Sequence, residues 1–405
     1  MTKKSDAPAI RFKGFSDAWE QRKLGECFSE RVESMPDGEL ISVTINDGIK
    51  KFSELGRHDN SNDNKSKYKK VCVGDIAYNS MRMWQGASGY SPYEGIVSPA
   101  YTVLSPNAGV FSRCIAYQFK LLQMIHTFQI NSQGITSDNW NLKYPTLSEI
   151  EIYISKNVAE QKQIAEFFTS LDNLITLHQR KFEKLTNVKK SMLEKMFPQN
   201  GSSYPEIRFK GFTDPWEQRK LGDIGKARSG VGFPDADQGG VTGVPFFKVS
   251  DMNLDGNENE MIVANNYVTA EQIADHRWSP ITELPAIFFA KVGAAVMLNR
   301  KRLCRFPFLL DNNTMAYSLS PTKWDADFAK ALFGTVDLTS LVQVGALPSY
   351  NAGDVESMGI YLPSLFEQEQ IGAFFKLLDN LITLHQRELE KLQNIKKSML
   401  EKMFV

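Results

Sequence analysis

Residues 158–197 read VAEQKQIAEFFTSLDNLITLHQRKFEKLTNVKKSMLEKMF, and residues 365–404 read LFEQEQIGAFFKLLDNLITLHQRELEKLQNIKKSMLEKMF. The two stretches are identical at 29 of 40 positions. Apolar side chains recur in both at alternating spacings of three and four, which predicts a helix with a coiled-coil seam. The seam positions are Ile164, Phe168, Leu171, Ile175, Phe182, Leu185, Val188, Met192 and Met196, then Ile371, Phe375, Leu378, Ile382, Leu389, Leu392, Ile395, Met399 and Met403.

Each predicted helix is long enough to serve as a rod. About 37 residues at ~1.5 Å each give a length of roughly 55 Å. Pro198 and the polar run QNGSS at 199–203 predict the end of the first helix and a short linker.

A second, shorter repeat shows that the whole half-protein is duplicated. Residues 8–26 and 205–223 are identical at 15 of 19 positions, with RFKGF and WEQRKLG in both. Between the copies lie two segments, 27–157 and 224–364, that do not match by eye. We therefore predict a duplicated framework that carries two different inserts. The expected parts are a first domain at 1–157, a first long helix at 158–197, a linker at 198–204, a second domain at 205–364 and a second long helix at 365–405.

Both inserts are predicted to be mixed α+β. β-branched and aromatic runs predict strands, and apolar residues at helical spacing predict helices. The expected strands are Val71–Ala77, Tyr101–Leu104, Val244–Val249, Ala286–Leu298 and Met315–Leu319. The expected helices are Ser112–Ile130 and a segment that carries Trp324, Phe328 and Leu332.

Composition narrows the class of protein. The chain has 405 residues, 42% of them hydrophobic and 23% charged, which fits two or three globular domains. It has no apolar run long enough for a transmembrane helix and no secretory signal, and its four cysteines form no CxxC pair, so we expect a reducing cytoplasm and no membrane. Lys plus Arg and Asp plus Glu both number 47, although a stand-alone DNA-binding protein usually carries excess positive charge.

The sequence contains no recognisable catalytic constellation. It lacks GxxxxGK[ST], HExxH, GxSxG and a DPPY-like tetrapeptide, and its five histidines are far apart. We therefore expect no catalytic residue and no metal site in this chain.

Two basic clusters are candidates for nucleic-acid contact. Arginine reads guanine, asparagine or glutamine reads adenine, and lysine holds phosphate. Solvated surface loops are an equally good interpretation of each cluster taken alone. The candidates are Lys67, Lys69, Lys70, Tyr78, Asn79, Arg82, Trp84 and Gln85 in the first insert, and Asn299, Arg300, Lys301, Arg302, Arg305 and Asn312 in the second.

Polar positions of the long helices also match between the copies, although a coiled-coil seam constrains only apolar positions. A recent duplication would preserve them, but it does not explain why the inserts have diverged. We interpret the matching positions as two identical outer faces for two identical partners, or for a symmetric dimer. The candidate partner-binding residues are Glu160, Gln161, Arg180, Lys189 and Lys190, with Glu367, Gln368, Arg387, Lys396 and Lys397.

The quoted repeats resemble the specificity subunits of type I restriction–modification enzymes. The stretches SMRMWQGASGYSPYEGIVSPAYTVL at 80–104 and GVPFFKVSDMN at 243–253 share this resemblance, which covers nearly the whole chain. One departure is Pro363, whose counterpart in the first copy is Lys156.

The resemblance implies an architecture and a division of labour. Two target recognition domains, joined by two long antiparallel helices about a pseudo-two-fold axis, would each read one half of a split target in double-stranded DNA. The helices would set the length of the spacer between the two half-targets, whose bases are not read, and would dock two methyltransferase subunits. Restriction (motor-nuclease) subunits would then bind to this assembly. The resemblance implies no cofactor on this chain, with S-adenosylmethionine on the methyltransferase subunit and ATP and Mg on the restriction subunit. Rival classes are a protein-binding scaffold and an enzyme with an unrecognised site.

Overall fold

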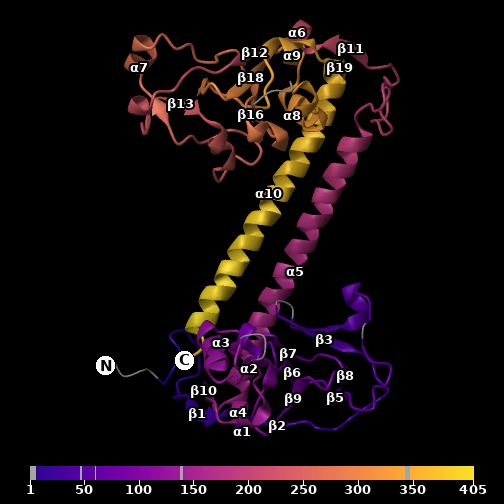
Figure 1. Ribbon diagram of the computed structural model, residues 1–405, viewed down its shortest axis with the longest axis vertical. Coiled ribbons are helices and arrows are strands. Elements are labelled where there is room, and N and C mark those ends of the chain that lie inside the picture. The colour runs from indigo at the N-terminus through magenta and orange to yellow at the C-terminus, as the bar shows by residue number, and fades with distance from the viewer. Residues whose placement is uncertain (1–5, 46–47, 60, 137–139, 343–346) are drawn as a thin grey trace. The chain divides into compact units, whose positions relative to one another are not determined.

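The computed structural model describes residues 6–45, 48–59, 61–136, 140–342 and 347–405. They form two compact units. Unit 1 comprises Met1–His178 and Glu388–Val405, and unit 2 comprises Gln179–Arg387. The boundary between the units therefore cuts both long helices, α5 (Val158–Lys195) and α10 (Leu365–Lys402) (Figure 1).

Unit 1 contains a small framework sheet and a larger insert sheet. In the framework, β1 (Glu20–Lys23) pairs antiparallel with β10 (Glu151–Ile154). The four-stranded sheet has the order β2-β9-β6-β7. Its strands are β2 (Phe28–Glu30), β6 (Ile76–Asn79), β7 (Ser88–Tyr90) and β9 (Tyr101–Pro106). Two antiparallel strand pairs complete the insert, β3 (Ile41–Thr44) with β4 (Gly48–Lys51) and β5 (Lys69–Val71) with β8 (Gly95–Val97). The short helices are α1 (Leu24–Cys27), α2 (Ser112–Gln118), α3 (Leu122–Ile130) and α4 (Tyr144–Ser148).

Unit 2 repeats this arrangement. β11 (Glu217–Lys220) pairs antiparallel with β19 (Gly359–Leu362), and the four-stranded sheet has the order β12-β18-β15-β16. Its strands are β12 (Gly225–Ser229), β15 (Ala286–Ala290), β16 (Lys301–Cys304) and β18 (Thr314–Leu319). A further sheet orders β14 (Tyr267–Val268), β13 (Val244–Phe247) and β17 (Leu309–Leu310). The short helices are α6 (Leu221–Ile224), α7 (Ala270–Asp275), α8 (Ala326–Thr335) and α9 (Ala352–Ser357).

The two four-stranded sheets therefore have the same strand order, counted from the strand that follows the framework helix α1 or α6. The inserts differ in sequence yet share this topology. The structure confirms an α+β chain with a duplicated framework and two long helices, and the axis that would relate the two units stays a prediction.

The two helices run antiparallel inside each unit. In unit 1, the Phe168 ring lies 6.0 Å from that of Phe404. One helical turn further along α5, Asp172 pairs with Lys396, which lies earlier in α10. In unit 2, Phe197 lies 5.8 Å from Phe375. Seam residues of the two helices also share a core in each unit, Phe168 with Met403 in unit 1 and Phe375 with Met196 in unit 2, as the heptad pattern predicts.

The C-terminal end of each long helix packs into the core of the unit that contains the start of the other long helix. Met403 and Phe404 are buried in unit 1 beside Trp19, whereas Met196 and Phe197 are buried in unit 2 beside Trp216. Gln123 of α3 also donates a hydrogen bond to the Val405 carbonyl at 3.0 Å. The repeated sequence at the helix ends is therefore needed for the core of each unit.

Two insert predictions were wrong in detail. The predicted strand Val71–Ala77 is interrupted by a turn between β5 and β6, where Gly74 has a φ of 99° that favours glycine. The predicted helix Ser112–Ile130 is divided into α2 and α3, because Leu121 is extended with a ψ of 139°.

A third prediction, the strand Ala286–Leu298, is correct only for its first part. β15 covers Ala286–Ala290, and a 3-10 helix at Ala294–Leu298 follows Gly293, which has a φ of 82°. The strands expected at 101–104 and 315–319 and the helix expected around Phe328 are confirmed by β9, β18 and α8. The strand expected at 244–249 is confirmed for Val244–Phe247 (β13), and a 3-10 helix begins at Val249.

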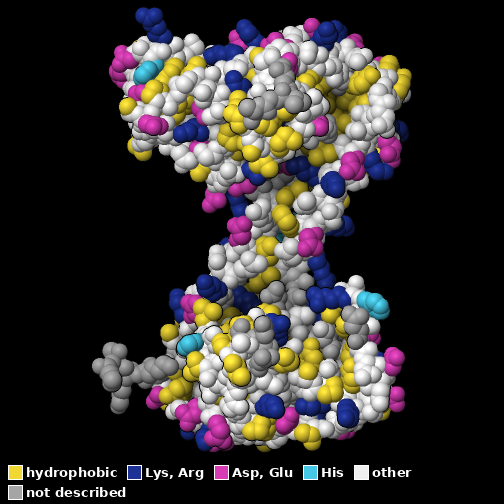
Figure 2. Space-filling model, viewed as in Figure 1, with side chains coloured by type: hydrophobic (Ala, Val, Ile, Leu, Met, Phe, Trp, Pro, Cys, Tyr) yellow, Lys and Arg dark blue, Asp and Glu magenta, His cyan; other side chains and the backbone are white. Residues whose placement is uncertain are grey.

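Basic and acidic side chains are interspersed over the visible face of each unit, in keeping with their equal numbers (Figure 2). Within the described ranges, no helix combines the length and the hydropathy needed to cross a membrane. In the same ranges, no three His, Cys, Asp or Glu side chains are grouped in a way that could hold a metal ion.

Candidate nucleic-acid interface

A duplicated buried ion pair holds the framework together. The Arg11 guanidinium donates to both carboxylate oxygens of Glu160, at 2.7 and 2.8 Å, and Arg208 does the same to Glu367 at 2.7 and 2.8 Å. Both glutamates are 1% exposed. Burial raises the pKa of Glu160, but the hydrogen bonds from Arg11, Ser155 and Trp19, together with the positive charge of Arg11, outweigh this effect and hold the pKa below its usual range. Bidentate pairs of this kind fix geometry as well as adding energy.

The neighbouring glutamines are also engaged inside the units. Gln161 accepts a hydrogen bond from the backbone N–H of Phe111 at 2.7 Å, and Gln368 accepts one from that of Asp325 at 3.1 Å. Each glutamine also donates to backbone carbonyls. They therefore tie the start of each long helix to the insert beside it.

A second duplicated ion pair joins the two long helices within each unit. Lys396 of α10 lies 2.5 Å from Asp172 of α5, and Lys189 of α5 lies 2.5 Å from Asp379 of α10. Each pair crosses from the end of one helix to the first half of the other. The pairs therefore support the antiparallel packing that the seam residues establish.

The inserts reach the same two carboxylates. The Tyr117 hydroxyl, on α2, donates to Asp172 at 2.8 Å, and Lys330 of α8 lies 2.7 Å from Asp379. Each aspartate thus links three elements, two from the framework and one from the insert. The chemistry of the third contact differs between the units, while its position is the same.

These contacts change the interpretation of the matching polar positions. Four of the candidate partner-binding residues are buried and do not lie on an outer face: Glu160, Gln161, Glu367 and Gln368. Lys189 and Lys396 are half-buried in the ion pairs between the helices. The exposed candidates are Arg180, Lys190, Arg387 and Lys397. The match between the copies therefore has an internal cause at six positions, and partner contact by the exposed four stays a prediction.

The lysines of the first basic cluster differ in whether a carboxylate lies close to the ammonium group. Lys69 lies 3.2 Å from Glu30, and Lys70 lies 3.1 Å from Glu33. Lys67 is exposed. The charges of the first two are thus partly neutralised within unit 1, and Lys67 is the one of the three that faces solvent most openly.

The aromatic part of this cluster is mainly structural. Tyr78 is fully buried, and its hydroxyl donates to the Leu142 carbonyl at 3.1 Å, so it cannot face a nucleic acid in this conformation. Asn79 accepts a hydrogen bond from the N–H of Met81 at 3.0 Å, and Trp84 donates to the Met81 carbonyl at 3.1 Å. Both therefore shape the turn that follows β6.

Arg82 is the exposed cation on that turn. Its guanidinium donates one hydrogen bond, to the Gln85 side chain at 3.4 Å, so most of its donors are not used by other described residues. We predict that Arg82→Ala weakens specific DNA binding by about 1–3 kcal/mol and relaxes one base position if Arg82 contacts a guanine edge. Competition binding against duplexes that vary one position at a time measures this. A uniform loss over all sequences would place Arg82 on a phosphate, and no loss would favour a solvated loop.

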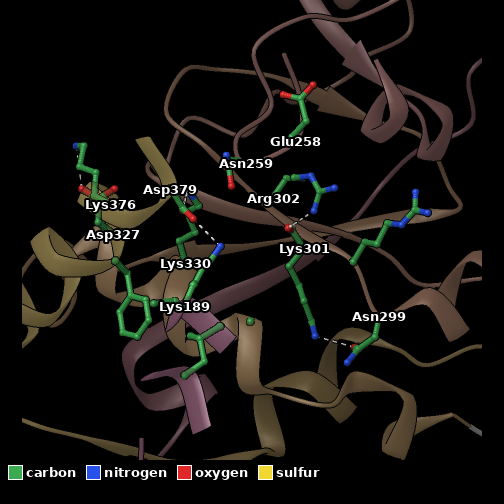
Figure 3. Close-up of a pocket in the computed structure, with 15 residues that line it drawn as sticks. Lys189, Glu258, Asn259, Asn299, Lys301, Arg302, Asp327, Lys330, Lys376 and Asp379 are labelled. Atoms are coloured by element: carbon green, nitrogen blue, oxygen red, sulfur yellow. Dashed lines mark hydrogen bonds and ion pairs between the residues drawn. The ribbon is translucent and has the colours of Figure 1, made fainter. Parts of the chain in front are cut away.

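The second basic cluster borders a cavity of about 300 Å³ in unit 2 (Figure 3). Six cationic and three acidic side chains line it. The cations are Lys189, Arg300, Lys301, Arg302, Lys330 and Lys376, and the acids are Glu258, Asp327 and Asp379. Lys189, Lys330 and Asp379 come from the framework helices and α8, and they form one group in the close-up.

Three candidate residues in this cluster already use some or all of their charged groups in contacts inside unit 2. Arg302 donates through Nε to the Asn257 carbonyl at 2.7 Å and through Nη1 to the Lys301 carbonyl at 2.9 Å. Burial lowers the pKa of Arg302 and lowers that of Lys301 to about 8. Arg305 pairs with Glu260 at 3.0 Å and with Asp327 at 2.5 Å.

The remaining members are two asparagines and Arg300. Asn299 accepts hydrogen bonds from the Lys301 ammonium at 2.7 Å and from the N–H of Leu338 at 3.1 Å, so it holds the turn before β16. Asn312 and Arg300 are exposed. The structure thus brings Asn299, Arg300, Lys301 and Arg302 together, and of these Arg300 is the most accessible.

Unit 1 has a cavity in the corresponding place, of about 650 Å³. It is bordered by the Asp172–Lys396 pair and by Arg113 and Lys120. Burial lowers the pKa of Lys120 to about 8. Each unit therefore has a cationic hollow where its insert meets the helix pair, and the sequence did not reveal either one.

Sequence reasoning also missed Arg11 and Arg208, which lie in the short repeats. The available signal was a cation at the same place in both short blocks and an anion at the same place in both long blocks. A buried glutamate needs a partner, so the pairing could have been proposed from the duplication alone.

Comparisons with known proteins agree with this architecture. The family described as type I restriction modification DNA specificity domain matches residues 16–187 and 213–394. The MjaVIII type I restriction enzyme specificity subunit of Methanocaldococcus jannaschii is 24% identical over 371 residues, 83% of this chain and 81% of the relative. The MjaIX specificity subunit of the same organism is 24% identical over 308 residues, 74% of this chain and 69% of the relative.

Solved structures support the fold. The S subunit of a type I restriction–modification system from M. genitalium superposes with a TM-score of 0.64 at 16% identity, covering 98% of this chain and 99% of that one. A chain from a study of complex assembly and conformational transition of the type I R-M system gives a TM-score of 0.50 at 14% identity, with the same coverage. With two matched family domains on a duplicated framework, this chain belongs to the type I restriction–modification specificity subunits and has two recognition domains.

Proposed function

We propose that each recognition domain reads one half of a split target in double-stranded DNA. The observation that supports this most is the combination of a duplicated, closely similar framework with two different inserts. The same ion pairs, Arg11–Glu160 and Arg208–Glu367, anchor two domains that share a sheet order but carry different basic clusters. Such a chain presents two different reading surfaces in the same way, as a target with two unlike halves requires.

The proposal assigns catalysis to other subunits. Two methyltransferase subunits dock on the framework and carry S-adenosylmethionine, and restriction subunits supply ATP- and Mg-dependent translocation and cleavage. This chain binds no cofactor and works in the cytoplasm. Phosphate contacts dominate DNA affinity, and partner subunits can supply many of them, which reconciles DNA recognition with a net charge of zero.

Methylome sequencing of the host with and without this chain tests the function. Loss of one bipartite methylated motif on deletion, and its return on complementation, is the expected result. An unchanged methylome together with intact protein complexes would favour a scaffold that does not touch DNA. Methyl transfer or cleavage by the isolated chain would favour an enzyme.

Docking of the methyltransferase is expected to involve the exposed, repeated arginines. Reversing the charge of Arg180 and Arg387 together should weaken assembly more than either change alone, because each belongs to one copy of the same surface. Native mass spectrometry measures the assembly state. An intact complex with two methyltransferase subunits in the double variant would remove these arginines from the interface.

The long helices are expected to set the spacer between the half-targets. Four additional residues in each helix add about one turn, or roughly 6 Å. DNA rises about 3.4 Å per base pair, so the spacer in the methylated motif should grow by one or two pairs. The added turn also rotates the domains, so activity can fall as the spacer lengthens. An unchanged spacer in an active variant would show that the helices do not set the distance.

A further inference from the structure

Three consecutive cations distinguish the unit 2 cavity. Arg300, Lys301 and Arg302 border it, and among the described residues none of them lies within ion-pair distance of a carboxylate. The other cations of the cavity have carboxylate partners, because Lys189 and Lys330 share Asp379 and Lys376 pairs with Asp327. The cations of this cavity that lack a carboxylate partner among the described residues therefore lie on β16 and on the residue before it.

Their hydrogen-bond donors are not equally available. Arg302 uses Nε and Nη1 on backbone carbonyls, which occupies the side of the guanidinium that would form a two-pronged contact through Nε. The Lys301 ammonium donates to Asn299 and to the Val336 carbonyl. Arg300 uses Nη1 on Asn253 at 2.5 Å, and its Nε and Nη2 have no acceptor among the described residues. Arg300 thus retains a free fork, while its two neighbours mainly contribute charge.

We infer that this cavity holds one phosphate group of the DNA backbone. The inference rests on the proposed function and gives it a particular anchoring point. A phosphate has only acceptor oxygens, and the free Nε/Nη2 side of Arg300 matches it in a bidentate contact. Lys301 and Arg302 add positive charge from half-buried positions, where solvent screens it less than on an open surface.

The position of the cavity gives the contact a purpose. Its other wall is made by Lys189 and Asp379, which belong to the two long helices. Phosphate contacts fix the register of a protein on DNA without carrying sequence information. A phosphate bound here ties the half-target read by unit 2 to the helices at a fixed place.

A change at Glu258 should affect DNA affinity in the direction opposite to a change at Arg300. The exposed carboxylate of Glu258 lines the cavity, accepts a hydrogen bond from the backbone N–H of Gly256 at 2.9 Å, and has no ion pair among the described residues. It opposes a phosphate at this place. Removing its charge should therefore strengthen DNA binding, whereas a misfolded variant would weaken it.

The experiment measures binding of a random-sequence duplex across a salt series, with the full-length chain purified together with the subunits that accompany it. Neutralising one phosphate contributes about 0.9 to the slope of log affinity against log salt. Arg300→Gln should reduce the slope by about that amount, and Glu258→Gln should raise affinity. Arg300→Lys, which keeps the charge, should retain most of the slope. Inorganic phosphate, added at constant ionic strength, should compete with the duplex more weakly in Arg300→Gln than in the unaltered chain.

Specific binding separates the outcomes. If Arg300→Gln leaves the slope unchanged and relaxes one base position of the methylated motif, Arg300 reads a base and the phosphate site is wrong. If neither slope nor affinity changes in Arg300→Gln and Glu258→Gln, the cavity binds no DNA. Neither result affects the proposed function. That function would be contradicted if the bipartite motif of the unaltered chain were methylated equally with and without this chain.

Discussion

Phe404→Ala is expected to unfold unit 1 and to leave unit 2 folded. Phe404 is 5% exposed, stacks 6.0 Å from Phe168 and meets Trp19 edge-on at 6.0 Å. Truncating a buried phenylalanine to alanine costs about 3–5 kcal/mol, and the two aromatic contacts add to this. That is a large part of the stability of one domain. Hydrogen–deuterium exchange should show lost protection in peptides from 6–178.

Phe197→Ala is the matched variant. Phe197 occupies the equivalent position in unit 2 beside Trp216, at 6.0 Å, so protection should instead be lost in peptides from 179–387. Phe366→Ala serves as the control, because Phe366 is 63% exposed and surface changes usually stay within about 0.5 kcal/mol. If both core variants destabilised both units equally, the two cores would not be independent.

Breaking the buried ion pair is expected to have the second largest effect. Glu160→Gln keeps the side-chain shape but leaves the Arg11 guanidinium, 13% exposed, without its counter-charge. Breaking a buried pair costs about 3–5 kcal/mol, and we expect the lower end because Arg11 partly reaches solvent. Chemical denaturation measures the loss. The double variant Arg11→Gln, Glu160→Gln should recover part of it, since no isolated charge remains; no recovery would mean that the pair acts through shape alone.

The same pair makes unit 1 sensitive to acid. The pKa of Glu160 is held below its usual range, so the folded state binds the proton less readily than the unfolded chain. Its stabilisation is therefore present above the unfolded pKa of about 4.3 and is lost as pH falls through the folded pKa. Glu160→Gln should show a weaker loss of stability over this acidic range than the unaltered chain.

The long helices could be predicted from sequence because one regular pattern determines them. The seam positions around Phe168 and Phe375 follow heptad spacing, and their partners across each unit follow the same spacing. The inserts could not be predicted to the same extent. Their sheets depend on pairings between distant strands, such as β6 with β9 and β15 with β18, and no local pattern specifies these.

The candidate site shows why residue type alone is a poor guide to exposure. Tyr78 and Arg82 lie four residues apart in one cluster, yet the first is core and the second is exposed. Glu160 and Arg180 both match their copies, yet the first is buried in an ion pair and the second faces solvent. The sequence records the chemistry of a side chain, whereas its freedom to bind depends on neighbours that only the fold brings together.

Exchanging residues 27–157 for the insert of another specificity subunit tests the central claim most directly. The framework pair of Arg208 and Glu367 lies outside the exchanged segment, so the second recognition domain keeps its support, and the Arg11–Glu160 pair remains to hold the new insert. Sequencing the methylome of a host that carries the hybrid is the measurement. Independent reading by two domains predicts that one half of the methylated motif changes and the other half stays the same. A change in both halves, or in neither while methylation persists, would contradict it.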